Sequence, residues 1–328
     1  MTRPVLVTGG AGYIGAHACK ALRNAGFLPV TYDNLSNGWR DAVRFGPLEV
    51  GDLADRSRLD AVFAEWKPVA VMHFAALSLV GDAMRDPGTY WRANVLGALN
   101  LIEASVAAGC LDFVFSSTCA TYGDQDGVML DEDTPQRPIN AYGKSKRAIE
   151  DMLADFGASQ GLRSVIFRYF NVAGADPDGE VGEFHRPETH LIPLMLDAID
   201  GKRPALTVFG TDYPTPDGTC IRDYVHVSDL VDAHVLGLNW LLDGKGSRVF
   251  CLGTGAGFSV HEVIEQSRQV TNREVPVVYG ERRAGDAVSL VSGSARALRE
   301  LGWKPSRSTM RAMIADAWRW HQGNGYKS

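Results

Sequence analysis

The sequence predicts an α/β protein in which a doubly wound parallel sheet is followed by a smaller C-terminal α/β domain. Two observations carry this prediction. Short apolar runs alternate strictly with amphipathic segments through the first half of the chain, and a glycine-rich turn follows the first run. Alternating strands and helices form right-handed βαβ units, which build a parallel sheet with helices on both faces.

The elements of the first half are predicted from their periodicity and from the turn residues between them. Six short apolar runs are expected to be strands: Val5–Thr8, Pro29–Tyr32, Leu48–Val50, Ala70–His73, Phe113–Ser116 and Val165–Arg168. Four segments with a 3.6-residue period are expected to be helices: Ile14–Ala25, Asp55–Trp66, Asn94–Ala108 and Tyr142–Gln160.

The local composition of the chain changes after Asn171, where turn-rich stretches such as Gly174–Glu180 and Tyr213–Thr219 appear. Clusters of Gly, Pro and Asp favour loops over regular elements. We therefore expect a first domain over residues 1–171 and a second over 172–328. Within the second, Arg248–Leu252 has the composition of a strand, so residues 221–255 are expected to return in part to the main sheet.

Composition limits the possible partners and the compartment. The net charge of −6 argues against nucleic acid or an anionic membrane surface as the main partner. The five cysteines are odd in number and form no C-x-x-C pair, which fits a reducing compartment and a zinc-free protein. The chain opens without a basic-then-apolar leader, and no apolar run reaches about 20 residues. We expect a cytoplasmic protein. Because the eight histidines are not spaced as ligands, we expect no metal.

The glycine-rich turn predicts a dinucleotide site. Gly9, Gly12 and Gly15 fall between the first predicted strand and the first predicted helix, in the Rossmann pattern G-x-x-G-x-x-G. Glycines there permit a tight turn and let a pyrophosphate approach the positive helix N-terminus. Asp33 ends the second strand, where a carboxylate binds ribose hydroxyls and repels a 2′-phosphate, so the expected cofactor is NAD. Asp52, after the third strand, either reads the adenine amino group or is a turn residue.

The predicted helix from Tyr142 carries a catalytic pair. Tyr142 and Lys146 lie one turn apart, on the same stripe as Ile149 and Leu153. A lysine on an apolar stripe is costly unless it is paired or reaches water. Beside NAD, its ammonium and the cationic nicotinamide would favour the phenolate of Tyr142. Tyr142 is then a general base for an alcohol whose carbon gives up hydride, and Lys146 also anchors the cofactor ribose.

These motifs carry a family resemblance. The glycine pattern together with Tyr142-x-x-x-Lys146 resembles the extended short-chain dehydrogenase/reductase superfamily. Further blocks, spread in order over nearly the whole chain, resemble the UDP-glucose 4-epimerase family: Phe115–Gly123, Arg168–Ala175, Phe209–Thr219, Ile221–Val227 and Arg282–Asp286. The resemblance implies a Rossmann fold, bound NAD and a UDP-sugar substrate, with the second domain binding the UDP-sugar.

The resemblance also implies contact residues. Thr118 would contact the sugar hydroxyl and complete the catalytic group with Tyr142 and Lys146. The implied NAD contacts are Tyr13, Ile14, Asp33, Asn34, Leu35, Ser36, Asn37, Gly38, Asp52, Leu53, Phe74, Ala75, Ala76, Asn94 and Phe170, with Ser78 replacing a lysine of some relatives. Thr118, Tyr142 and Lys146 also border the cofactor.

An acidic protein needs local cations to hold a diphosphate, and Arg222 and Arg283 match the family's phosphate-binding arginines. The remaining substrate contacts implied by the resemblance are Asn171, Leu191, Thr207, Val208, Phe209 and Asp286. His190 replaces an asparagine of some relatives, so it either hydrogen-bonds the diphosphate or fills space. Leu290 replaces a bulky tyrosine beside the sugar, which suggests that N-acetylated UDP-hexosamines also enter.

The expected reaction is the interconversion of UDP-galactose and UDP-glucose through a 4-keto sugar, with the hydride held on tightly bound NAD. Close alternatives are 4-epimerases of UDP-arabinose and UDP-xylose, of UDP-glucuronate and UDP-galacturonate, or of UDP-GlcNAc and UDP-GalNAc. A 4,6-dehydratase would need an acid pair where this chain has Cys119 and Ala120. A non-catalytic NAD-sensing protein would not need Tyr142, Lys146 and Thr118 together. The resemblance also suggests a homodimer formed through Asn94–Ala108 and Tyr142–Gln160.

Overall fold

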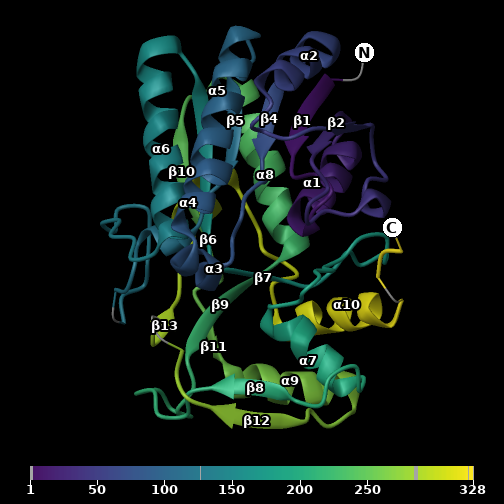
Figure 1. Ribbon diagram of the computed structural model, residues 1–328. Coiled ribbons are helices and arrows are strands. Elements are labelled where there is room, and N and C mark those ends of the chain that lie inside the picture. Colours follow the sequence, from purple (N-terminus) through teal and green to yellow (C-terminus); the bar gives the residue numbers. More distant parts are fainter. Residues whose placement is uncertain (1–2, 126, 284–286, 324, 328) are drawn as a thin grey trace.

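The computed structural model describes residues 3–125, 127–283, 287–323 and 325–327 (Figure 1). Its main layer is a seven-stranded parallel sheet in the order β10-β6-β5-β4-β1-β2-β3. The strands are β1 (Arg3–Thr8), β2 (Phe27–Asp33), β3 (Leu48–Val50), β4 (Ala70–His73), β5 (Asp112–Ser116), β6 (Arg163–Tyr169) and β10 (Arg248–Leu252). The order reverses beside β1, and ligands of such sheets bind outside the carboxyl ends of the strands at that point.

All six strands expected in the first half are present, and so is the doubly wound architecture. The strand expected at Arg248–Leu252 pairs with β6 at the sheet edge, with Phe250 opposite Phe167. The second half of the chain therefore supplies one strand of the main sheet.

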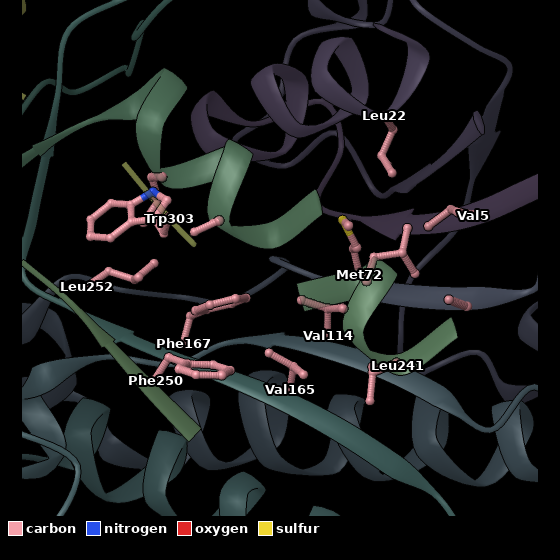
Figure 2. Close-up of a cluster of buried hydrophobic side chains, with 14 of the residues drawn as sticks. Val5, Leu22, Met72, Val114, Val165, Phe167, Leu241, Phe250, Leu252 and Trp303 are labelled. Atoms are coloured by element: carbon pink, nitrogen blue, oxygen red, sulfur yellow. The ribbon is translucent and has the colours of Figure 1, made fainter. Parts of the chain in front are cut away.

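Helices cover both faces of this sheet. One face carries α1 (Tyr13–Asn24) and α8 (Val227–Leu242), and the other carries α2 (Arg56–Trp66), α5 (Gly97–Ala107) and α6 (Ala141–Gln160). Figure 2 shows Leu22 and Leu241 on the first face, in one buried cluster with Val5, Met72 and Val165. Since successive strand residues point to opposite faces, Leu6 belongs to the second cluster.

The helix expected over Asn94–Ala108 begins earlier. A π-helical turn, η2 (Trp91–Leu96), runs directly into α5, after the short helices α3 (Val80–Arg85) and α4 (Pro87–Tyr90). Asn94 lies within η2, fully buried, where its amide accepts from the backbone N–H of Leu77 and donates to the Leu77 carbonyl. Apolar periodicity does not predict this π-helical turn, because the buried residue within it, Asn94, is polar.

The smaller part lies at the carboxyl-terminal side of the main sheet (Figure 1). Its strands are β7 (Asn171–Ala173), β8 (Leu206–Phe209), β9 (Ile221–His226), β11 (Gly257–Ser259), β12 (Val277–Gly280) and β13 (Ser289–Leu290). Its helices are α7 (Leu191–Ile199), α9 (Val260–Thr271) and α10 (Met310–Gln322), with the π-turn η4 (Ala297–Leu301) beside the main sheet. β9 pairs with β7, β11 and β13, and β8 pairs with β12. In the described part of the chain, no helix has the length and apolar character needed to cross a membrane.

Candidate active site

The turn after β1 is shaped for close approach of a ligand to the backbone. Gly9 has φ 74°, and a Cβ there would lie 2.6 Å from the Ala75 nitrogen. A Cβ on Gly15 would lie 2.0 Å from the Gly9 carbonyl oxygen. Gly12 is the N-cap of α1 and has no capping side chain, so no side chain covers the first amides of the helix. The turn therefore fits a pyrophosphate.

Asp33 and Asp52 shape the loops beyond β2 and β3. The Asp33 carboxylate accepts from the backbone N–H groups of Ala11 (3.0 Å) and Leu35 (2.8 Å), and burial raises its pKa against these hydrogen bonds. Asp52 accepts from the Asn34 amide at 2.8 Å and so joins the two loops. A cavity of about 390 Å³ adjoins them, lined by Leu35, Ser36, Asn37, Gly38, Trp39, Arg40 and Arg186.

The start of α6 positions Tyr142. The Asn140 side chain caps the helix by accepting from the Gly143 N–H at 2.8 Å. A Cβ on Gly143 would lie 2.4 Å from the Ala120 carbonyl oxygen, so only glycine lets α6 approach the 3₁₀ turn η3 (Cys119–Thr121) this closely. Tyr142 is half-buried near the Thr118 side chain. Burial raises the pKa of Tyr142 to about 12, and Thr118 opposes this shift.

Lys146 lies inside the protein with a backbone partner. Its side chain is 2% exposed, its Nζ donates to the Ser116 carbonyl oxygen at 2.9 Å, and its ammonium lies 4.9 Å from the centre of the Phe115 ring. Burial lowers the pKa of Lys146 to about 7, and Glu150 opposes that shift. From the sequence we expect the Lys146 ammonium and a cationic nicotinamide together to favour the phenolate of Tyr142. In the chain by itself, burial raises the pKa of Tyr142 and the Lys146 ammonium donates to the Ser116 carbonyl oxygen.

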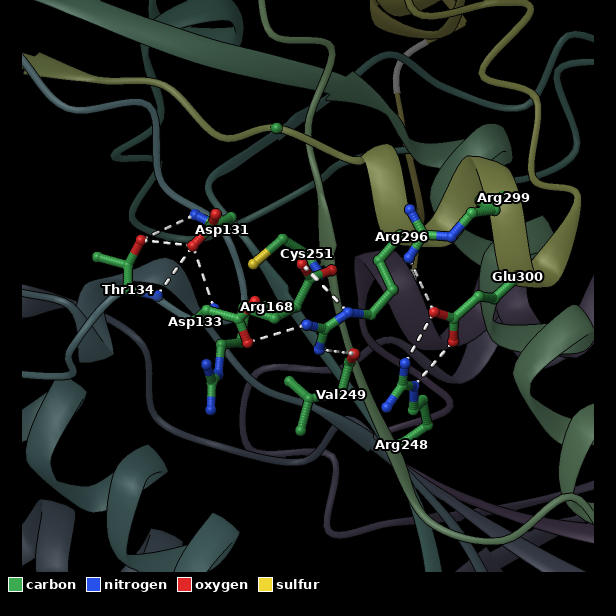
Figure 3. A network of polar contacts seen from close by, with 12 residues as sticks. Asp131, Asp133, Thr134, Arg168, Arg248, Val249, Cys251, Arg296, Arg299 and Glu300 are labelled. Atoms are coloured by element: carbon green, nitrogen blue, oxygen red, sulfur yellow. Dashed lines mark hydrogen bonds and ion pairs between the residues drawn. The ribbon is translucent and has the colours of Figure 1, made fainter.

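A buried ion pair supports this helix and was not predicted from the sequence. Glu150, one turn after Lys146, accepts from Arg168 of β6 at 2.6 Å, and both side chains are under 10% exposed. Arg168 also donates to the Tyr122 hydroxyl at 2.9 Å. Glu150 lies on the same inward-facing stripe of the helix as Lys146, and this spacing in the sequence could have indicated a buried carboxylate. Figure 3 shows Arg168 beside a second network, in which Arg248 and Arg296 pair with acidic side chains.

The NAD contacts implied by the resemblance gather at one edge of the sheet. They follow the carboxyl ends of successive strands: Gly9 follows β1, Asp33 ends β2, Asp52 and Leu53 follow β3, Phe74, Ala75 and Ala76 follow β4, Thr118 follows β5, and Phe170 follows β6. Asn94 reaches the same region through its bonds to Leu77. Ser78 is exposed before α3.

The expected substrate contacts lie on the smaller part. Arg222 of β9 is opposite Leu290 of β13, and its guanidinium donates to the Ala287 carbonyl oxygen at 2.9 Å. The Arg283 guanidinium lies 5.0 Å from the centre of the Phe209 ring, at the end of β8, which also holds Thr207 and Val208. Asn171 begins β7 beside β9. Asp286 lies outside the described residues.

His190 is the N-cap of α7, before Leu191, and stands in a cluster that the sequence analysis missed. Its Nδ1 hydrogen-bonds Glu183, and the Nδ1 of His185 lies 3.4 Å from both Glu183 and Glu188. These four side chains have the ligand types and proximity to hold a metal ion. Their spacing within one loop matches no metal motif, so the sequence did not indicate them.

A second acidic group, formed by Asp176, Asp178 and Glu180, surrounds the ammonium of Lys20 at 2.6 to 2.8 Å. Lys20 belongs to α1, so these ion pairs tie the loop after β7 to the first helix of the main layer. The lysine offsets part of the negative charge of these three carboxylates, and their shared contact with it accounts for their clustering.

Comparison with known proteins places these features in a family. Residues 5–253 match the model of the NAD dependent epimerase/dehydratase family. The chain is 51% identical over 317 residues to a UDP-glucose 4-epimerase of Rhizobium meliloti (strain 1021), covering 97% of this chain and 96% of the relative.

Solved structures give the same result. A UDP-glucose 4-epimerase from Brucella ovis in complex with NAD superposes with a TM-score of 0.94 at 46% identity, over 97% of this chain and 98% of the other. A UDP-glucose-4-epimerase from Stenotrophomonas maltophila, with bound NAD and formylated UDP-arabinopyranose, gives a TM-score of 0.94 at 39% identity, over 98% of each chain.

Proposed function

This chain belongs to the NAD dependent epimerase/dehydratase family, and we propose that it interconverts UDP-galactose and UDP-glucose with Tyr142, Lys146 and Thr118 as its catalytic residues. One observation carries the residue assignment. The Thr118 side chain acts on the Tyr142 phenol and lowers its pKa against the effect of burial, and both residues lie at the sheet edge that the glycine-rich turn and Asp33 also reach. An alcohol bound between them meets a base and a second hydrogen-bonding group.

Tyr142 exchanges the proton of the sugar 4-hydroxyl. The phenolate accepts this proton as the C4–H bond breaks, and the phenol returns it to the ketone oxygen when that bond re-forms on the other face. The glycine-rich turn and Asp33 would hold NAD, which would supply the acceptor and later the donor of the C4 hydride, so the reaction would be redox-neutral overall. Because burial, the largest cause, raises the pKa of Tyr142 to about 12, the phenolate requires positive charge nearby.

Lys146 and Thr118 orient the reacting groups. The Ser116 carbonyl fixes the Lys146 ammonium, and the remaining two N–H bonds of that ammonium point to other acceptors, which include the cofactor ribose in this proposal. Thr118 Oγ1 accepts from the Ala120 N–H at 3.1 Å, which holds the hydroxyl in place for the sugar.

The nucleotide end would be held firmly and the hexose loosely. Arg222, Arg283 and His190 supply cationic or donor groups for the diphosphate, and the segment Thr207–Phe209 lines the uracil pocket. Apart from Tyr142 and Thr118, the residue proposed beside the sugar is the apolar Leu290. The 4-keto sugar can therefore turn within the site and present its other face.

In this proposal, residues 1–171 hold NAD and residues 172–328 hold the UDP-sugar. Residues 221–255 belong to the second range and return in part to the main sheet. The described cysteines are all free, which suits the cytoplasm. We also propose a homodimer through α5 and α6, where exposed apolar residues such as Trp91 and Leu96 flank the helices.

One assay tests the function. Purified protein is incubated with UDP-galactose without added NAD, and the products are separated by chromatography. Formation of UDP-glucose supports the proposal. A 4-keto-6-deoxy product would indicate dehydration, and no turnover by folded, NAD-loaded protein would contradict the proposal.

Leu290 favours a second substrate class. Leu290 is half-buried in β13 opposite Arg222. Some members of the UDP-glucose 4-epimerase family carry tyrosine at this position. A leucine leaves room for an N-acetyl group, so UDP-GlcNAc and UDP-GalNAc are proposed as additional substrates. Incubation with each, followed by chromatography, tests this, and failure to interconvert them would exclude it.

A further inference from the structure

Two consecutive residues at the end of β5 are bound to α6, directly before Thr118. Lys146 donates to the Ser116 carbonyl oxygen at 2.9 Å, and the Ser117 hydroxyl donates to the Glu150 carboxylate. Lys146 and Glu150 lie one helical turn apart on the inward face of α6. Ser117 is 1% exposed and Glu150 is 5% exposed, so water does not compete for their contact. The helix therefore holds both the backbone and a side chain of the segment that leads into Thr118.

The Glu150 carboxylate has a fixed orientation. Arg168 donates from Nε to Oε1 of Glu150 at 3.1 Å and from Nη2 to Oε2 at 2.6 Å. Gln136 donates to the same Oε2 at 3.0 Å. A two-point pairing between guanidinium and carboxylate fixes the plane of the carboxylate. Oε1, the oxygen to which Ser117 also donates, therefore has a set position in the protein.

The peptide group between Ser116 and Ser117 is fixed as well. Its carbonyl accepts from Lys146, and its N–H donates to the Phe167 carbonyl oxygen of β6 at 2.8 Å. Because a peptide group is planar, these contacts also place the Cα atom of Ser117. Only the two backbone dihedral angles of Ser117 separate this plane from the next peptide group, which carries Thr118.

The side chain of Ser117 restrains the first of these angles. A rotation about its N–Cα bond moves the side chain and the following carbonyl carbon together. Since the hydroxyl is bound to Glu150, that rotation is opposed. On the far side, the Thr118 carbonyl oxygen accepts from the Thr121 hydroxyl at 2.9 Å. The backbone of Thr118 is therefore held from both directions.

We propose that Ser117 is a positioning residue for Thr118: its hydroxyl, bound to Glu150, keeps the Thr118 hydroxyl where it can contact the sugar beside Tyr142. This inference rests on the proposed function and extends it to a residue that does not touch substrate. Tyr142, Lys146 and Glu150 lie on successive turns of α6, so one face of a single helix sets the geometry of the segment from Ser116 to Thr118.

Two other residues provide matched controls. Ser105 of α5 is fully buried, and its hydroxyl donates to the Cys110 carbonyl oxygen. Ser105→Ala therefore removes the same group from a similar environment, away from Thr118. Gln136 binds the same carboxylate as Ser117 but lies in the segment before α6. Gln136→Ala therefore removes a hydrogen bond to Glu150 and leaves the Ser117 contact in place.

The test compares the kinetics of Ser117→Ala with those of Ser105→Ala and Gln136→Ala. In Ser117→Ala we expect kcat for UDP-galactose to fall about tenfold, because substrate and cofactor still bind while the Thr118 hydroxyl is displaced. Its KM and its content of bound NAD should change less than about twofold. Both controls should keep kcat within about twofold of the wild type, whatever their melting temperatures. An equal kcat in Ser117→Ala and the controls would overturn the proposal.

A double-substitution cycle separates the positioning role from a structural one. In a Thr118→Ala background, Ser117→Ala should change the residual kcat by less than about twofold, because the hydroxyl that it positions is gone. An equal fold-decrease in both backgrounds would contradict the proposal. If the wild-type protein is active and Ser117→Ala matches it in kcat, the proposal fails while the proposed function stands. An inactive wild type contradicts the function instead.

A second variant tests the carboxylate and leaves Ser117 unchanged, so it also gives an answer if Ser117→Ala does not fold. Arg168→Lys keeps a positive charge beside Glu150 but loses the two-point pairing that fixes the carboxylate. We expect kcat to fall about threefold or more, with KM changed less than about twofold. A wild-type kcat in folded Arg168→Lys would show that the orientation of Glu150 is not needed, and the proposal would be wrong.

Discussion

The Nζ of Lys146 donates a hydrogen bond to the carbonyl oxygen of Ser116 over 2.9 Å. This contact joins α6, which carries Tyr142, to the end of β5, one residue from Ser117 and two from Thr118. The ammonium is therefore bound to the strand that leads into Thr118, and the two elements that carry the proposed catalytic residues are fixed relative to each other through a backbone atom.

The buried lysine makes stability depend on pH. In the NAD-free protein the pKa of Lys146 is lowered from 10.5 to about 7, mainly by burial. Between these values the unfolded chain holds a proton that the folded chain lacks, so the free energy of unfolding rises with pH by up to about 1.4 kcal/mol per unit. Lys146→Met should lack this rise. Denaturant unfolding of NAD-free protein from about pH 7 to about pH 10 measures the difference.

Parallel curves for Lys146→Met and the wild type would show that Lys146 holds its proton throughout this range. The comparison needs no assumption about other titrating groups, because both proteins share them.

Removal of the Tyr142 hydroxyl should abolish turnover and spare the cofactor. Tyr142→Phe keeps the aromatic ring but has no proton to exchange, so we expect kcat for UDP-galactose to fall by about 10³-fold or more. Bound NAD, released by denaturation and quantified by absorbance, should be unchanged. Tyr90→Phe is the control, since Tyr90 is a buried tyrosine whose hydroxyl donates to the Leu79 carbonyl oxygen. Near-normal activity of Tyr142→Phe would remove Tyr142 from the mechanism.

Two adjacent carboxylates of α6 should differ sharply in their contribution to stability. Glu150 is buried against Arg168, and its removal leaves an unpaired buried guanidinium, so Glu150→Ala should lower the free energy of unfolding by about 3 kcal/mol. Asp151 pairs with Arg147 on the surface, and Asp151→Ala should change it by less than about 0.5 kcal/mol. Chemical denaturation of both variants checks this. Similar losses for the two would mean that helix propensity, and not the buried pair, dominates.

The size of residue 290 should set the choice of sugar. Leu290→Tyr fills the space opposite Arg222, so kcat/KM for UDP-GalNAc should fall at least about tenfold relative to that for UDP-galactose. Both are measured with the same protein sample. Leu290→Met, which conserves volume, serves as the control and should leave the ratio of the two values unchanged. A constant ratio in Leu290→Tyr would place the discriminating residue elsewhere.

The fold was largely predictable because its determinants are local. Leu48–Val50 and Ala70–His73 are strands with the predicted bounds, and the helix predicted from Tyr142 starts at Ala141. Apolar periodicity and turn residues are enough for these. The π-turn at Trp91–Leu96 was missed because it accommodates the buried amide of Asn94, whose partner Leu77 lies far off in sequence.

The candidate site was predictable where a residue type and a spacing define it, as for Gly9–Gly15, Asp33 and the Tyr142–Lys146 pair. The partners of these residues were not. The backbone of Ser116 as the acceptor for Lys146, and Arg168 as the partner of Glu150, arise from the pairing of strands and helices in space. Glu183 and His190 meet through a loop held by Trp39 and Trp320, a geometry that sequence spacing does not encode.

Because β10 belongs to the main sheet, protein engineering cannot separate the two parts of the molecule with a single cut in the chain. A chain cut after Ala173 would lose α8 and β10, and with them Leu238, Leu241 and Phe250 from the buried cluster, of which Figure 2 labels Leu241 and Phe250. It would also expose β6 as an unpaired edge, and such edges promote aggregation. The smaller part, proposed to bind the sugar nucleotide, is therefore not a module that can be exchanged whole between relatives. A change of substrate must be introduced residue by residue, at positions such as Leu290, within an otherwise intact chain.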